Sequence, residues 1–180
     1  RQEVTAIRPE AGNYIHGYMV NAGFSDSVKA FHSAHPEVPL HFFWDKADTA
    51  EVTRMDETLS FHQLDDVKFL NYMAGCRAYA STAGFESICE AMYLGKPVLM
   101  VPAHIEQDCN AYDAVRAGAG IVSDSFALEP LLRFAGKYCP SREFIYWARS
   151  SDRHIICELE NLIDHQSVVN IPTFTNYLPI

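Results

Sequence analysis

Short apolar runs alternate with segments of helical period along most of this chain, and this alternation limits the folds it can adopt. The runs that favour strands are residues 14–20, 39–44, 58–64, 77–82, 97–102 and 119–122. Helical spacing of apolar side chains follows several of them, at residues 25–35, 65–75, 84–95 and 108–118. Strands that alternate with helices predict a parallel sheet covered on both faces. We therefore expect a three-layer α/β domain with a mainly parallel sheet of about six strands.

The two ends of the chain lack this periodicity. Residues 1–12 end in Ala-Gly and are expected to be a tail or the remnant of a linker. Residues 13–165 are expected to form one domain, which ends in helices at 128–138 and 141–165. Residues 166–180 contain two prolines and no repeating pattern, so we expect an extended or disordered tail. With 180 residues, 48% of them hydrophobic, the chain can bury one substantial core.

Composition excludes several classes of partner. The formal net charge of -9 and the scattered Lys and Arg residues argue against a nucleic-acid partner, because that affinity depends on clustered basic side chains. No apolar run approaches the roughly 20 residues that a membrane span requires. The five cysteines show no CxxC spacing, which favours reduced thiols in the cytoplasm and argues against a disulfide or metal framework. We expect no metal site and no resident cofactor.

Two turns follow strands at the edge where parallel sheets bind ligands. The first is "NAGFS", where Gly23 allows close backbone approach and Asn21 is a further candidate for ligand binding; a turn that needs small residues explains it equally well. The turn holds no GxGxxG motif, which argues against an ordinary nicotinamide dinucleotide site. His62 lies near the same predicted edge, where it could offset phosphate charge or simply be solvated.

The second turn, "STAGFES", opens a helix and suits a diphosphate. Thr82 can cap the helix, while Ala83 and Gly84 leave its backbone uncovered. The start of a helix carries about half a positive elementary charge, and Ser87 adds a hydroxyl group there. Glu90 follows three residues later on the same face, where a carboxylate can accept from both hydroxyls of a ribose. The alternative is an ordinary capped helix start.

A third group of polar residues follows the strand at 97–102. Glu106 and Gln107 stand in what the pattern predicts to be a polar loop at the same edge of the sheet. An acceptor beside an amide can bind sugar hydroxyls. The pair on its own would equally fit a solvated loop.

Taken together, residues 82–111 resemble the nucleotide-sugar signature in the C-terminal domain of GT-B glycosyltransferases, such as plant UDP-sugar transferases and the bacterial peptidoglycan GlcNAc transferase. The residues that match at the spacing of the plant family, without a gap, are Gly84, Ser87, Glu90, Pro97, Glu106, Gln107, Asn110 and Ala111. The resemblance implies that this chain is the Rossmann-like C-terminal half of a GT-B fold.

The resemblance also implies roles for these residues. Gly84 and Ser87 would approach the diphosphate, Glu90 would hold the ribose, and Glu106 and Gln107 would touch the donor sugar. The "NAGF" turn takes the place of the family's first phosphate-contacting loop, and "SFHQL" resembles the strand end and loop that receive the uracil base.

Two residues depart from the plant signature. Thr82 stands where that family has its diphosphate-binding histidine, and Glu86 stands where it has asparagine. A carboxylate near a diphosphate is repelled by about 1 kcal/mol or more. We therefore do not expect Glu86 to be a ligand.

The resulting interpretation is the donor-binding domain of a glycosyltransferase, with a UDP-sugar as donor substrate. In the families it resembles, the catalytic base lies in an N-terminal acceptor-binding domain, so we assign no catalytic residue here. That domain would belong to the same chain or to a separate subunit, and association of the full enzyme with a membrane surface is left open. The alternatives are a GT-B-like sugar-nucleotide 2-epimerase domain and a non-catalytic nucleotide-sugar-binding module.

Overall fold

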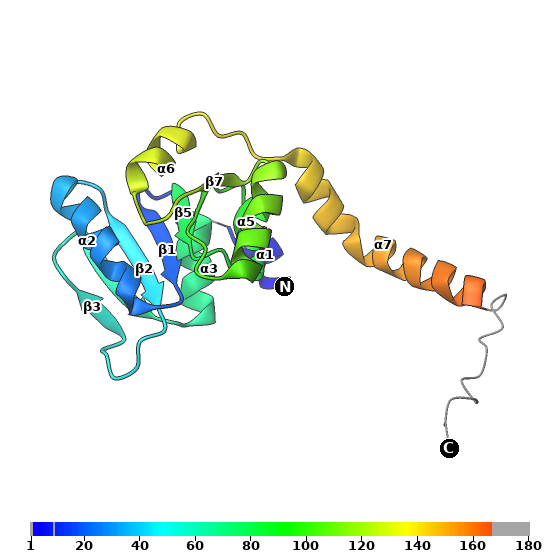
Figure 1. Cartoon of the computed structure of the whole chain (residues 1–180), viewed down its shortest axis with the longest axis horizontal. Helices are drawn as coiled ribbons and strands as arrows, with labels where there is room; N and C mark the ends of the chain where they lie inside the picture. Colours follow the sequence, from blue (N-terminus) through cyan, green and yellow to red (C-terminus); the bar gives the residue numbers. More distant parts are fainter. Residues whose placement is uncertain (1, 9, 167–180) are drawn as a thin grey trace, which may run out of the picture. The chain divides into compact units, whose positions relative to one another are not determined.

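The computed structural model describes residues 2–8 and 10–166. These fall into two compact units, one ending at Phe144 and the other beginning at Ile145. The first unit contains the sheet, and the second contains most of the long helix α7 (Arg142–Gln166) (Figure 1). Within the described part of the chain, no helix combines the length and apolar character needed to cross a bilayer.

The first unit is built on one seven-stranded sheet. Its strands are β1 (Ile15–Met19), β2 (Leu40–Trp44), β3 (Val52–Arg54), β4 (Leu59–Gln63), β5 (Ala78–Ser81), β6 (Val98–Met100) and β7 (Gly120–Val122). Their order across the sheet is β3-β4-β2-β1-β5-β6-β7. Every neighbouring pair is parallel except β3 and β4, which are antiparallel. The sheet is mainly parallel, as the alternation of elements predicts.

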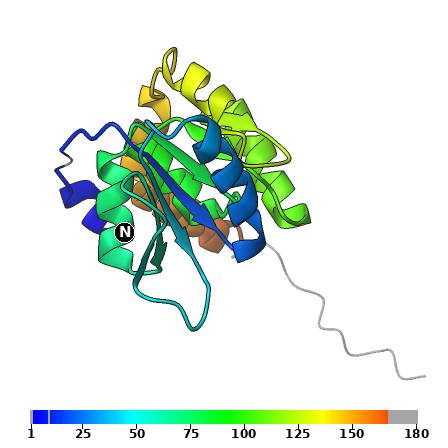
Figure 2. The same ribbon diagram turned by 90° about the vertical axis from the view of Figure 1, so that its left-hand side faces the viewer.

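Helices cover both faces of this sheet, and Figures 1 and 2 show them on its two sides. The elements of this unit other than strands are α1 (Gln2–Ala6), the 3-10 helix η1 (Ala22–Phe24), α2 (Ser25–Ala34), α3 (Asp66–Gly75), α4 (Phe85–Tyr93), α5 (Ile105–Arg116) and α6 (Leu128–Ala135). One core lies under α2 and α6, and the other lies under α3, α4 and α5. Adjacent residues of β2 enter different cores, Phe42 the first and Phe43 the second, because successive side chains of a strand point to opposite faces. The three-layer α/β prediction is confirmed.

The structure differs from the sequence-based expectations in three places: at β3, at α1 and at the start of α5. The short strand β3 was not predicted, because its three residues make no apolar run and gain their place only by pairing with β4. Residues 2–6 form helix α1, although no element was expected in residues 1–12; Val4 is buried and anchors it. The expected tail at 166–180 lies outside the described residues, apart from Gln166 at the end of α7.

The third difference concerns the expected loop around Glu106. Helix α5 already begins at Ile105, so Glu106 and Gln107 lie in its first turn. The Oε1 of Gln107 accepts a hydrogen bond from Ala103 N at 2.8 Å, which satisfies a backbone donor just before the helix. Acidic residues in a first turn also favour a helix start, because its dipole is positive there.

Candidate functional site

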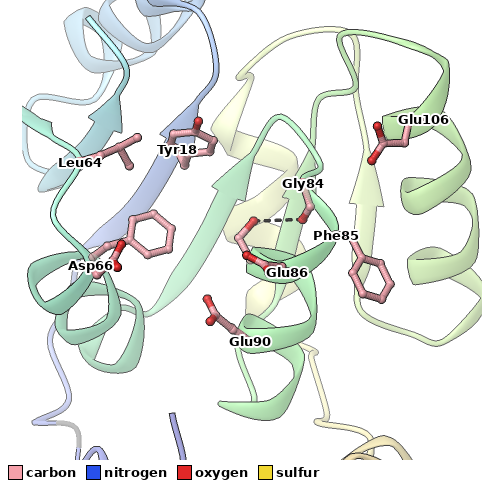
Figure 3. Close-up of a pocket in the computed structure, with 10 residues that line it drawn as sticks. Tyr18, Leu64, Asp66, Gly84, Phe85, Glu86, Glu90 and Glu106 are labelled. Atoms are coloured by element: carbon pink, nitrogen blue, oxygen red, sulfur yellow. Dashed lines mark hydrogen bonds between the residues drawn. The ribbon is translucent and has the colours of Figure 1, made fainter. Parts of the chain in front are cut away.

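A cavity of about 370 Å³ opens at the carboxyl ends of the parallel strands, between α3 and α4 (Figure 3). Its lining residues come from the ends of β1 and β4, from the first turns of α3 and α5, and from the start and second turn of α4; they are Tyr18, Leu64, Asp66, Phe69, Gly84, Phe85, Glu86, Ser87, Glu90 and Glu106. This is the edge at which open α/β sheets bind ligands.

The turn between β5 and α4 has a strained conformation. Ala83 adopts the left-handed region, with φ 64°, at a cost of about 1–2 kcal/mol for a residue with a Cβ atom. Two hydrogen bonds hold it there: Ala83 N donates to Ser81 Oγ at 3.2 Å, and Asn110 Nδ2 donates to Ala83 O at 3.2 Å. Asn110 thus fixes the turn that sets the direction of α4.

Gly84 is the N-cap residue of α4, and no side chain caps this helix. Its φ of -64° and ψ of 132° are open to any residue. A Cβ atom built at Gly84 would be 3.7 Å from Ser87 Oγ, an ordinary contact. Neither backbone strain nor crowding therefore requires glycine. What glycine does provide is an uncovered helix start on the wall of the cavity.

Ser87 and Glu90 are one helical turn apart and both line the cavity. The hydroxyl of Ser87 donates to Gly84 O at 3.1 Å, the bond drawn in Figure 3. Glu90 is only 9% exposed, and Figure 3 shows its carboxylate on the side of α4 that faces α3. The spacing read from the sequence therefore puts a hydroxyl and a carboxylate on one cavity wall.

The electrostatics of the cavity are acidic. Its described lining includes the carboxylates of Asp66, Glu86, Glu90 and Glu106 and no Lys or Arg. On the α4 wall, the feature that attracts an anion is therefore mainly the positive end of the helix dipole. Among the described residues, no cluster of three or more His, Cys, Asp or Glu side chains is placed to hold a metal ion.

The wall opposite α4 is aromatic. Tyr18 meets Phe69 of α3 edge to face, with ring centroids 6.1 Å apart. Burial raises the pKa of Tyr18, and the nearby Asp45 adds to the shift, so this hydroxyl remains a neutral donor at pH 7. A flat nucleobase could contact such a wall.

Several expected site residues lie outside this cavity. Thr82 is fully buried, and its Oγ1 accepts from Val20 N at 3.3 Å, which ties the end of β5 to the end of β1. Asn21 and Gly23 lie after β1 at the same edge, but Asn21 Oδ1 accepts from Gly23 N at 2.8 Å and starts η1. The side chain of Ala83 is buried, so this residue can contribute to the site only by shaping the turn described above.

His62 and Gln107 are also held within the protein. His62 lies in β4, stacks on Phe43 with ring centroids 4.9 Å apart, and has its Nε2 2.9 Å from Ser60 Oγ. Burial lowers the pKa of His62 to about 4, so it carries no positive charge near neutral pH. Gln107 uses its Oε1 for Ala103 and does not line the cavity.

The structure adds lining residues that sequence reasoning did not single out, notably Tyr18, Asp66, Phe69 and Phe85. The sequence feature that could have identified Asp66 is its position just after the strand at 58–64, at the same edge of the sheet as the turn before α4. Phe69 looked like an ordinary core position of a helix, and only the packing of α3 beside α4 shows that one side of its ring faces the cavity.

The seven-stranded mainly parallel sheet, its covering helices and a cavity at the strand ends define a GT-B Rossmann-like domain. The family model described as glycosyl transferase family 1 matches residues 1–135. The chain belongs to this family. Comparison with curated protein sequences gave no match.

Solved structures support the fold. The glycosyltransferase SnogD from Streptomyces nogalater aligns with a TM-score of 0.57 and 18% identity, covering 79% of this chain and 40% of that one. The spinosyn forosaminyltransferase SpnP aligns with a TM-score of 0.57 and 15% identity, covering 91% and 46%. The spinosyn rhamnosyltransferase SpnG, in complex with thymidine diphosphate, gives a TM-score of 0.50 and 16% identity over 64% and 33%. The chain spans less than half the length of each.

Proposed function

We propose that this chain is the donor-binding domain of a glycosyltransferase and that its cavity binds the nucleotide part of a nucleotide sugar. The observation that carries the proposal is the uncapped start of α4, with Ser87 and Glu90 on the same wall of one cavity. Backbone N–H groups at a helix start bind phosphate oxygens, and a buried carboxylate one turn away suits a pair of ribose hydroxyls.

In this proposal each lining residue takes a defined part of the ligand. The diphosphate lies at the backbone of Gly84 and at the Ser87 hydroxyl, and the ribose hydroxyls donate to Glu90. The base lies against Tyr18 and Phe69. Glu106, in the first turn of α5, is left for the donor sugar, because it lines the cavity from the helix after β6.

The donor we propose is a UDP-sugar. This choice rests on the resemblance of residues 82–111 to the signature of UDP-sugar transferases. One similar structure was solved with thymidine diphosphate, so that nucleotide belongs in the same screen.

Exposed apolar side chains at the mouth of the cavity favour contact with a partner domain. Three apolar side chains at this edge are strongly exposed: Leu64 at 49%, Phe85 at 63% and Ile105 at 77%. Sugar transfer also needs an acceptor held close to the donor and a base to take its proton. We propose that an acceptor-binding domain covers this edge and supplies both. The isolated chain should then bind donor but transfer no sugar to a simple acceptor.

Calorimetric titration of the chain with UDP, UDP-glucose, UDP-GlcNAc and thymidine diphosphate tests the proposal. Glu90→Gln should weaken UDP binding about tenfold or more, because it replaces a charged acceptor by a neutral amide. Glu57→Gln is the matched control, since Glu57 is exposed just before β4, at the opposite edge of the sheet. Failure of every nucleotide to bind, or equal UDP affinities in the wild type and Glu90→Gln, would contradict the proposal.

A further inference from the structure

The peptide group between Ala83 and Gly84 is held by a side chain from another element. Its carbonyl oxygen, Ala83 O, accepts a hydrogen bond at 3.2 Å from Asn110 Nδ2, in the middle of α5. Asn110 does not line the cavity and has no part in the contacts proposed for the donor. Its bond to Ala83 O is therefore the observation from which a role for this side chain can be argued.

The nitrogen of the same peptide belongs to the cavity wall. Gly84 lines the cavity at the start of α4, and among the described residues its N–H group donates to no protein acceptor (Figure 3). The peptide is trans, so it is planar and its C=O and N–H bonds point in opposite directions. A carbonyl group held toward Asn110 thus directs the Gly84 N–H away from Asn110.

The turn has little of its own to keep this peptide in place. Ala83 has φ 64°, a left-handed conformation that residues with a Cβ atom avoid. The bond from Ala83 N to Ser81 Oγ holds the peptide before Ala83, not the one after it. Gly84 adds no restriction, because glycine accepts most backbone angles. Without the Asn110 amide, the turn could relax and the Gly84 N–H could change direction.

Helix α5 is a firm support for this contact. Ala111, which follows Asn110, is buried, and so is Ala114 one turn after Asn110. Both pack in the same core as the side chain of Ala83. Because close-packed cores resist displacement, the position of Asn110 relative to the turn is set by packing on both sides.

We propose that Asn110 is a positioning residue for the donor diphosphate and acts through the peptide between Ala83 and Gly84; this inference rests on the proposed function. The amide fixes the direction of the Gly84 N–H before a ligand arrives, so a phosphate oxygen meets a donor that is already aligned. A site that is aligned for only part of the time binds more weakly by that fraction. Asn110 thus raises affinity without touching the ligand.

The test is a double-mutant cycle in which UDP is titrated into the full chain. Asn110→Ala should weaken UDP binding by about threefold to tenfold, because the strained turn can then relax. In the Ala83→Gly background the same substitution should cost no more than about twofold, because glycine adopts the left-handed conformation without strain. Asn71→Ala is the matched control: Asn71 is exposed on α3 and off the cavity wall, so UDP affinity should not change.

Uridine separates positioning from general damage to the site. It keeps the base and the ribose but lacks the diphosphate, so its affinity, followed by amide chemical shifts, should be the same in the wild type and Asn110→Ala. Unchanged UDP affinity in Asn110→Ala, an equal loss in the Ala83→Gly background, or a uridine affinity that falls together with that for UDP would overturn this inference alone. A wild-type chain that binds no UDP would overturn the proposed function as well.

Discussion

Gly84 is the residue at which structure and function can be separated most cleanly. Its backbone angles suit any residue and a Cβ atom has room, so Gly84→Val should change the free energy of unfolding by less than about 1 kcal/mol. The added side chain would cover the start of α4, and UDP affinity should fall at least about tenfold. Urea unfolding and calorimetry on the same preparation check both. Undiminished UDP binding would show that the diphosphate lies elsewhere.

Glu86 lines the cavity in the first turn of α4, where it stabilises the helix but repels a diphosphate. Glu86→Gln should therefore raise UDP affinity severalfold at low ionic strength, and the gain should shrink as salt is added. Asp108→Asn, in the first turn of α5 but off the cavity wall, serves as control. A lower affinity in Glu86→Gln would mean that this carboxylate contacts the ligand directly.

At the residue scale, the sequence predicts which side chains share a face when spacing along one element decides the geometry; their roles as ligands stay predictions. Ser87 and Glu90 share a cavity wall because they are one helical turn apart, which the sequence contains. Gln107 and His62 show what the sequence alone could not predict. Whether a polar side chain faces a ligand or a backbone group depends on neighbours from other elements, and for Gln107 that neighbour is Ala103 N.

At the scale of elements, the sheet carries buried histidines whose neutral form the fold requires. His16 in β1 is fully buried, and its burial lowers its pKa to about 3. A backbone hydrogen bond at His41 raises this pKa, whereas the charges of the His41 and His62 rings lower it further. The pKa of His62 falls to about 4 through burial, then through His41 and Arg54.

Acid should therefore destabilise the protein. The unfolded state binds a proton on each histidine near pH 6.5, whereas the folded state resists it down to about pH 3 or 4, so stability is full above pH 6.5 and falls below it. Each histidine contributes up to about 1.4 kcal/mol per pH unit. Urea unfolding at pH 7.5, 6.5 and 5.5 should show this slope, and His16→Phe should reduce it by about one proton. An unchanged slope would mean that His16 does not set the acid response.

At the scale of the whole molecule, alternation of strands and helices was enough to predict the three-layer fold, because parallel sheets with two covered faces leave a strong apolar pattern. The pattern could not predict β3, which exists only through its pairing with β4. The cavity was predicted from one side only. Its α4 wall follows from the signature at residues 82–111, while its α3 wall depends on how α3 packs beside α4.

Amide chemical shifts report directly on whether a nucleotide diphosphate binds at the start of α4. The measurement is a titration of the ¹⁵N-labelled chain with UDP, followed residue by residue. We expect the largest shift changes at the amides of Gly84, Phe85, Glu86 and Ser87, with smaller changes at Tyr18 and Glu106. Shift changes centred elsewhere, such as at a separate cavity lined by Ser27 and Phe126, or none at millimolar UDP, would contradict it.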